Sequence, residues 1–205
     1  MNVNTYFPIL LIGLVAMIGD FVVPLILGKK YPNHNALYDV ISELGTKGSP
    51  VRKQISAWLI ILGILFVCFG IGQGLQFRNQ TWAHWIYLWG IVVFGIGAGV
   101  IAGIFPEDTK GVEETVSGKI HGIFSGLGFM FLIMNPLWAL WIDELNGLEG
   151  LNTILFVLGV ITFGLFVASE KKGAGILGMS GLWQRLNMLV IYSAILVNFI
   201  VTKPA

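Results

Sequence analysis

The sequence predicts an all-α integral membrane protein, a single domain of six transmembrane helices arranged as three helical hairpins, with both termini on the same side. Of its 205 residues, 56% are apolar and 11% are charged. A soluble domain has about 45–50% apolar and about 25% charged residues, so the excess apolar side chains must face lipid. Six apolar stretches each reach the length of about 20 residues that a helix needs to cross a bilayer core.

Each of the six stretches is expected to form one helix, because backbone N–H and C=O groups in lipid must be satisfied within the segment. The first stretch is too long for a cleaved signal peptide, has no basic segment before it, and has no small-residue cleavage site after it. We therefore expect it to be a true span. The predicted spans are 7–27, 56–76, 82–104, 119–141, 151–169 and 183–201.

The charged and metal-ligating residues exclude several classes of function. The net charge of +1 argues against nucleic acid as a partner. Cys68 is the single cysteine, so the chain can form neither an internal disulfide nor a cysteine metal cluster. The three histidines are too few and too scattered to predict a metal site. We expect membrane lipids as partners, with no metal and no cofactor.

The basic residues predict the orientation of the chain. Alternate spans place the termini on one side, which we call side A, and three longer polar loops on the other, which we call side B. Of the 12 Lys and Arg residues, all but Arg78 and Lys203 fall on side B. The positive-inside rule therefore predicts a cytoplasmic side B and extracytoplasmic termini. Because function often resides on loops held by a rigid scaffold, side B is also the expected working face.

Two neighbouring spans carry glycines at every fourth position, a spacing that lets helix backbones approach closely in lipid. We interpret the two rows as the contact between the third and fourth helices, although either row could instead form a homodimer. The rows are Gly95, Gly99 and Gly103, and Gly118, Gly122 and Gly126.

Cations near the helix N-termini of side B suit an anion such as a phospholipid head group. Topology alone would also place them there, and the acidic residues of the same loops could pair with them and leave no anion site. A site with charges of both signs could equally hold a zwitterionic head group. The candidate ligand-binding residues are Asp20, Glu43, Arg52, Asp108, His121 and Arg185.

Asp20 is exceptional because it lies about two-thirds of the way along the first span. A carboxylate at that depth is costly and indicates a functional site, although it could also hold helices together through hydrogen bonds. Pro24, one turn later, frees a backbone carbonyl nearby.

His121 is the candidate general base, with Ser42 and Asp108 on the same side of the membrane. These three could form a nucleophile, base and orienting acid. Ser42 does not lie in the GxSxG pattern of a nucleophile elbow, and a lone interfacial histidine is more often an ordinary polar residue. The three residues are therefore only catalytic candidates.

The side B loops carry three short motifs: Tyr31-Pro32 leading to Ile41-Ser42-Glu43-Leu44-Gly45 and Gly48-Ser49-Pro50, Phe105-Pro106-Glu107-Asp108 followed by Gly118 and His121, and Gly181 through Arg185. Together they resemble an uncharacterised prokaryotic membrane family catalogued as domain of unknown function 998, over nearly the whole chain. The resemblance implies a six-helix bundle and no established reaction. It singles out Ser42, Glu43, Pro106, Asp108, His121 and Arg185.

The function we expect is binding of a lipid or amphipathic small molecule at a polar pocket formed by the loops 28–55, 105–118 and 170–182. The alternatives are an intramembrane lipid-modifying enzyme using His121 and Asp108, a small transporter centred on Asp20, and a structural or regulatory subunit without a pocket. The enzyme requires His121 to lie near Asp108, and the transporter requires a polar cavity that reaches the middle of the bilayer.

Overall fold

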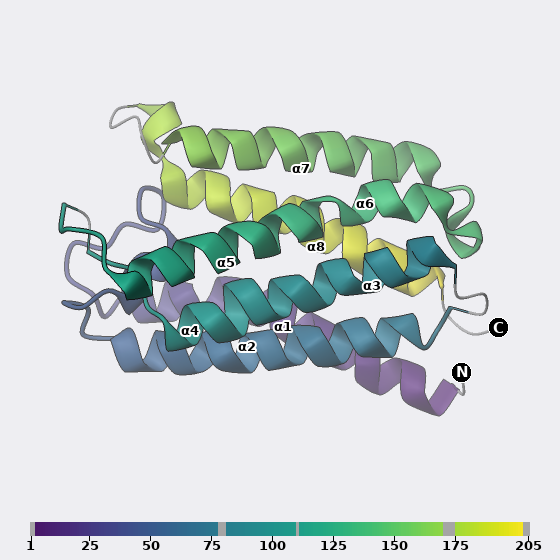
Figure 1. The fold of residues 1–205 in the computed structure, drawn as a ribbon, viewed down its shortest axis with the longest axis horizontal. Coiled ribbons are helices and arrows are strands. Elements are labelled where there is room, and N and C mark those ends of the chain that lie inside the picture. The colour runs from purple at the N-terminus through teal and green to yellow at the C-terminus, as the bar shows by residue number, and fades with distance from the viewer. Residues whose placement is uncertain (1–2, 78–80, 110, 170–174, 203–205) are drawn as a thin grey trace.

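The computed structural model is a bundle of long helices (Figure 1) and describes residues 3–77, 81–109, 111–169 and 175–202. Six helical segments are long and apolar enough to cross a membrane. The long helices are α1 (Val3–Gly28), α2 (Arg52–Gly74), α3 (Trp82–Phe94), α5 (Val116–Ile133), α7 (Glu149–Ser169) and α8 (Ser180–Val201). Shorter pieces are η1 (Ile41–Gly45), η2 (Gly95–Ile101), α4 (Ala102–Ile104), α6 (Asn135–Trp138), η3 (Ala139–Trp141), η4 (Asp143–Leu145) and η5 (Ile176–Gly178).

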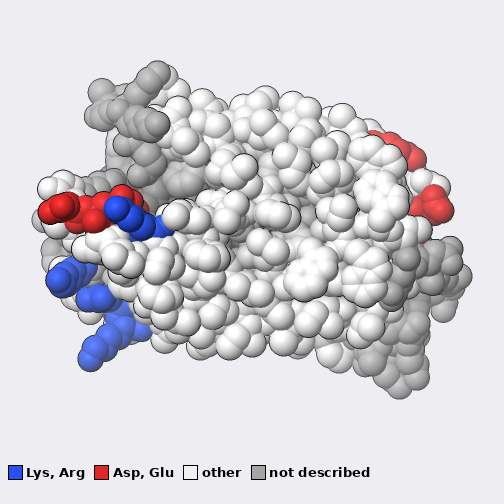
Figure 2. All heavy atoms as spheres, viewed as in Figure 1, with Lys and Arg blue, Asp and Glu red and all other residues white. Residues whose placement is uncertain are grey.

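The predicted all-α fold with six membrane-spanning helices is confirmed, and the protein is a multi-pass membrane protein. The third span consists of α3, the π-helical segment η2 and α4, and the fourth consists of α5, α6 and η3. Both termini lie at one end of the bundle (Figure 1). Figure 2 shows the Lys and Arg side chains of the visible face at the opposite end, beside acidic side chains.

Five of the basic residues used in the orientation count lie outside the described residues. These are Arg78, Lys110, Lys171, Lys172 and Lys203.

The helices pack mainly on their neighbours in sequence. The helix α1 contacts α2, α2 contacts α3 and η2, α5 contacts α3 and η2, and α7 contacts α8. In Figure 1, α1 and α2 lie along one edge of the bundle and α7 along the opposite edge. The predicted packing of the third span on the fourth is therefore present.

The glycines that make this contact are not the predicted ones. A Cβ on Gly99 would lie 2.7 Å from the backbone nitrogen of Gly63, and one on Gly103 would lie 2.7 Å from the carbonyl oxygen of Ser56. The row that contains them therefore packs on α2. The third span meets α5 through other glycines, because a Cβ on Gly97 would overlap the carbonyl of Phe124.

The second predicted row does not form a helix contact along its length. A Cβ on Gly122 or Gly126 would have no atom within 4 Å. The spacing of glycines shows that a helix face permits close approach, but it does not specify which neighbour approaches it. The interpretation of these two rows as the contact between the third and fourth helices is therefore wrong.

The side A half of the bundle is held by buried amide side chains. Asn152 and Asn198 exchange hydrogen bonds of 3.1 and 3.0 Å between α7 and α8. The side-chain amide of Asn198 also donates to the hydroxyl of Tyr87 at 3.4 Å, and that of Asn135 donates to the Tyr87 carbonyl at 3.0 Å. Polar groups in lipid need protein partners, so these bonds fix how α3, α6, α7 and α8 are rotated against one another.

The close approach at Gly99 predicts the effect of adding one methyl group. Gly99→Ala should lower the free energy of unfolding by about 1–3 kcal/mol, because its Cβ would overlap Gly63. Gly164→Ala on α7 is the matched control, since no atom lies within 4 Å of its Cβ, and it should be neutral or stabilising by about 0.5–1 kcal/mol. Unfolding by SDS titration in mild detergent measures both. Equal stabilities of the two variants would contradict the packing role of Gly99.

Candidate functional site

A cavity of about 260 Å³ lies in the side B half of the bundle, beneath the loop between α1 and α2. Its polar lining comes from the helices α1, α5 and α8 and from two loops, and consists of Asp20, Ser42, Glu107, His121, Ser125 and Gln184. Its apolar lining includes Leu62, Phe94, Phe129, Phe163, Phe166 and Met188. One cavity therefore joins a polar group of side chains to an apolar one.

Aromatic rings close the cavity toward the middle of the bundle. The ring centroid of Phe94 lies 5.3 Å from that of Phe129 and 5.0 Å from that of Phe66, and both pairs meet edge to face. The Phe66 ring also lies 5.3 Å from that of Tyr192. Because these rings come from α2, α3, α5 and α8, the floor of the cavity is also a point where four helices are joined.

The side of the cavity is open between α5 and α7. Gly122 and Val167 both line it and are also exposed at the surface, with Val167 44% exposed. Gly126, one turn beyond Gly122, also lines the cavity without filling it. Gly122 and Gly126 were predicted to pack two helices together; they instead leave space at this side of the cavity.

The ring of His121 has a defined orientation. It is 6% exposed, and Nδ1 lies 2.9 Å from the backbone carbonyl oxygen of Phe105. A carbonyl only accepts hydrogen bonds, so Nδ1 carries the proton. When the ring carries this one proton, Nε2 is left as an acceptor for a molecule in the cavity.

Two other lining residues have buried oxygen atoms without a hydrogen-bond partner. These atoms are Oε2 of Glu107 and Oγ of Ser125. Such groups are costly to bury unpaired. They therefore mark the polar part of the cavity as a place where a bound molecule would gain hydrogen bonds.

Asp20 lies deeper in the same cavity and is 4% exposed. Its Oδ2 accepts a hydrogen bond of 2.7 Å from the hydroxyl of Tyr192 on α8. No Lys or Arg side chain within the described ranges lines the cavity, so its charged lining consists of carboxylates.

The roof of the cavity is the loop after α1, and it is held against the first turns of α8. The backbone N–H of Ile41 donates to Oε1 of Gln184 at 2.8 Å, and the Ser180 hydroxyl donates to the carbonyl of Tyr38. Nη1 of Arg185 donates to the carbonyl of Ala36 at 2.7 Å. These contacts place Val40, Ile41 and Ser42 over the cavity.

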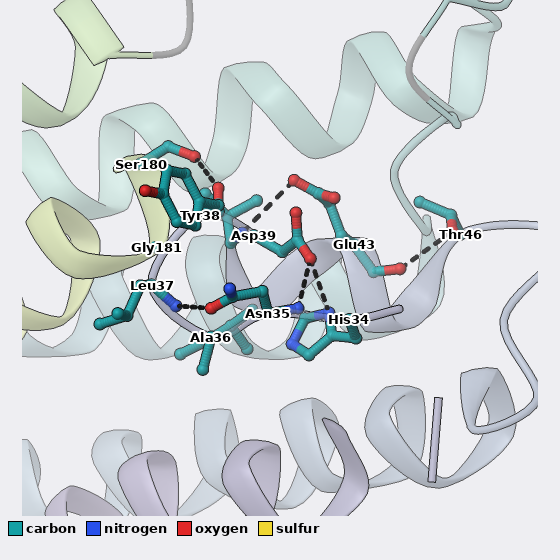
Figure 3. A network of polar contacts seen from close by, with 12 residues as sticks. His34, Asn35, Ala36, Leu37, Tyr38, Asp39, Glu43, Thr46, Ser180 and Gly181 are labelled. Carbon is teal, nitrogen blue, oxygen red and sulfur yellow. Dashed lines mark hydrogen bonds and ion pairs between the residues drawn. The ribbon is translucent and has the colours of Figure 1, made fainter. Parts of the chain in front are cut away.

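The loop itself is folded around Asp39 (Figure 3). Its Oδ2 accepts the backbone N–H of Asn35 at 2.7 Å and lies 3.5 Å from Nδ1 of His34. Burial is the main reason that the pKa of His34 lies below its usual value; the Asp39 carboxylate raises it and the Arg185 charge lowers it. The neutral ring of His34 is therefore part of the folded loop.

The loop between α4 and α5 is tied to the start of α5. The carboxylate of Asp108 accepts the backbone N–H of Thr115 at 2.7 Å and its hydroxyl at 2.9 Å. The Ser117 hydroxyl donates to the carbonyl of Pro106 at 3.0 Å. A Cβ on Gly118 would overlap the Asp108 carboxylate, so a side chain there would push the carboxylate away from Thr115.

A protein family described as "Protein of unknown function (DUF998)" matches residues 14–201. The chain belongs to the DUF998 family. No curated protein and no solved structure matches it.

The motifs that carry the likeness to DUF998 have structural roles here. Gly181 has room for no side chain, because a Cβ would overlap the carbonyls of Ala36 and Asp39. Arg185, four residues later, donates to both of those carbonyls. The glycine and the arginine thus act together to seat the first loop on α8.

The structure brings some of the candidate site residues together and separates others. Asp20, Ser42 and His121 line the cavity. The other candidates, Glu43, Arg52, Asp108 and Arg185, are not among its lining residues. The position expected for Asp108, next to His121, is taken by the Phe105 carbonyl.

Three lining residues, Glu107, Ser125 and Gln184, were not predicted as site residues from the sequence. Ser125 had a usable signal, since it lies four residues after His121 on one helix face. Glu107 lies in a motif whose aspartate was the expected functional acid. Gln184 gave no local signal, because its contact with Ile41 joins residues 143 positions apart.

The seating of the loop on α8 predicts the effect of removing the guanidinium. Arg185→Ala removes the donor to Ala36 and Asp39, so backbone amides 36–41 should exchange hydrogen at least about tenfold faster. Gly181→Ala should give a similar pattern by displacing the same carbonyls. Hydrogen exchange with mass spectrometry measures both effects.

Arg52→Ala is the matched control, because Arg52 is also a side B arginine at the start of a helix but lies outside this contact. Unchanged exchange in Arg185→Ala, or equal acceleration in the Arg52 variant, would contradict the role given to Arg185.

Proposed function

We propose that this protein binds an amphipathic molecule in the side B cavity, with the head group among the polar residues and the chain among the aromatic ones. The observation that carries the proposal is that one cavity is lined both by polar side chains, such as Glu107, His121 and Ser125, and by aromatic ones, such as Phe163 and Phe166. Ligand sites commonly combine apolar walls with a few convergent polar groups.

The size and opening of the cavity support a lipid-like ligand. Its volume of about 260 Å³ lies just below the range of about 300–1,000 Å³ of typical ligand pockets. It therefore suits a head group and the first part of one chain. The opening between α5 and α7, lined by Gly122 and Val167, would let the rest of the chain extend into the bilayer.

Filling the cavity tests the proposal. Gly126→Phe should displace the ligand, because the position has no atom within 4 Å and borders the cavity. Gly164→Phe adds the same side chain at an open position of α7 outside the lining. Mass spectrometry of molecules that co-purify in mild detergent should find a lipid species in the wild type and in the control that is reduced at least about tenfold in Gly126→Phe.

His121→Ala extends the test to the polar part of the cavity and should also lower retention. Identical lipid profiles in all four folded proteins would contradict the proposal and favour a structural or regulatory subunit. Folding of each variant is checked by its elution profile and helicity.

We also propose that side B faces the cytoplasm, so that the head-group end of the cavity lies at the inner leaflet. The support is the distribution of Lys and Arg, of which all but Arg78 and Lys203 lie in side B segments. Alkaline phosphatase fused after Ala205 should be active, and a green fluorescent protein at that position should be dark. The reverse result would place side B outside.

A further inference from the structure

We infer that the head group recognised by the side B cavity is a protonated primary amine, so that the ligand is a cationic, single-chain amphiphile. The inference rests on the proposed function and specifies its ligand class. It differs from a phospholipid phosphate, which the basic residues of side B suggest when the sequence is read alone.

The polar lining is rich in hydrogen-bond acceptors that have no protein donor. Oε2 of Glu107 is buried and unpartnered, and Nε2 of His121 is an acceptor when Nδ1 carries the proton that it shares with the Phe105 carbonyl. Oγ of Ser125 is also buried without a partner. An ammonium group brings three N–H donors and no acceptor, which matches this set.

The charged residues of the lining also favour an ammonium head group. Glu107 and Asp20 are carboxylates, and no Lys or Arg among the described residues lines the cavity. The Arg185 charge acts on Asp20, whereas Oε2 of Glu107 is buried without a partner, and a buried carboxylate oxygen without a counter-charge is strongly unfavourable. A cationic head group supplies that counter-charge, whereas a phosphate would place negative charge beside the Glu107 carboxyl group.

Arg185 is one of the two side B arginines considered as anion binders, and its Nη1 atom already donates hydrogen bonds to the protein. Nη1 of Arg185 donates to the carbonyls of Ala36, Asp39 and Gly181 at 2.7, 3.2 and 2.9 Å. Nε and Nη2 of Arg185 are buried without partners, but the residue is not part of the cavity lining. The guanidinium therefore serves the roof of the cavity and does not supply a phosphate clamp within it.

The size of the cavity and its aromatic lining favour a ligand with one chain. Phe129, Phe163 and Phe166 line this part, and the ring centroid of Phe129 lies 6.3 Å from that of Phe163 and 6.4 Å from that of Phe166. With these rings along it, the volume of about 260 Å³ favours a single chain over the two chains of a diacyl lipid.

The experiment compares three probes that share one tail and differ in the head group. Radiolabelled tetradecylamine, tetradecanol and tetradecyl phosphate are added at pH 7 to the full chain in phosphatidylcholine nanodiscs, and binding to empty nanodiscs is subtracted. The alkylamine is protonated at this pH, as a lysine side chain is. Tetradecylamine should bind the wild type roughly 10- to 100-fold more tightly than the other two, the range expected for hydrogen bonds to a charged group.

Glu107→Gln keeps the shape of the side chain and removes its charge, so it should reduce amine affinity at least about tenfold and leave tetradecanol unchanged. Glu114→Gln is the matched control, because Glu114 belongs to the same loop and is exposed, and it should bind the amine as the wild type does. If Glu107→Gln does not fold, the preference of the wild type among the three probes still decides the question.

Each remaining outcome overturns a defined part of the inference. Equal or tighter binding of tetradecanol or tetradecyl phosphate, abolished by Gly126→Phe, would overturn the amine and retain the amphiphile site. Amine binding that persists in both Glu107→Gln and Gly126→Phe would show adsorption outside the cavity and overturn the inference. No specific binding of any probe would overturn the proposed function together with it.

Discussion

The side B architecture depends on the seating of the first loop against the first turns of α8. Gly181 lets two loop carbonyls approach the helix to a distance that no side chain would allow, and Arg185 then donates to both. The backbone N–H of Leu182 donates to the carbonyl of Leu37 at 2.9 Å, which continues the same contact. Because this loop is the roof of the cavity, the position of Ser42 over the bundle depends on a contact made at the opposite end of the sequence.

The charged residues of side B have two separate tasks in this arrangement. Arg185, Asp108 and Asp39 bond to backbone groups and shape the loops. Glu107 and Asp20 are instead carboxylates of the cavity lining. This division leaves the cavity lined by carboxyl groups, although the loops around it carry many cations. A net count of charges at one end of a membrane protein therefore describes its topology better than it describes its ligand.

Glycine has opposite uses on neighbouring helices. At Gly63 and Gly99 it brings the backbones of α2 and η2 into contact, where van der Waals packing replaces the hydrophobic effect that is absent between helices in lipid. At Gly122 and Gly126 it leaves space, and this space is the side of the cavity. The π-helical segment η2 presents Gly97 to α5 and Gly99 to α2. The third span therefore allows close backbone approach by a neighbouring helix on two of its faces.

The sequence alone determined the number of spans, their limits to within a few residues, and the end of the bundle at which the polar loops meet, because hydropathy and chain length suffice for these. It also identified Asp20, Ser42 and His121, which line one cavity. Only the tertiary structure decided which glycines touch which helices, that Arg185 bonds to a loop, and that Glu107 and Gln184 join the lining. These features depend on the rotation of each helix about its axis. Where core and lipid are both apolar, the residue pattern along a helix hardly encodes that rotation, and it is fixed by contacts such as Ile41 with Gln184, 143 residues apart.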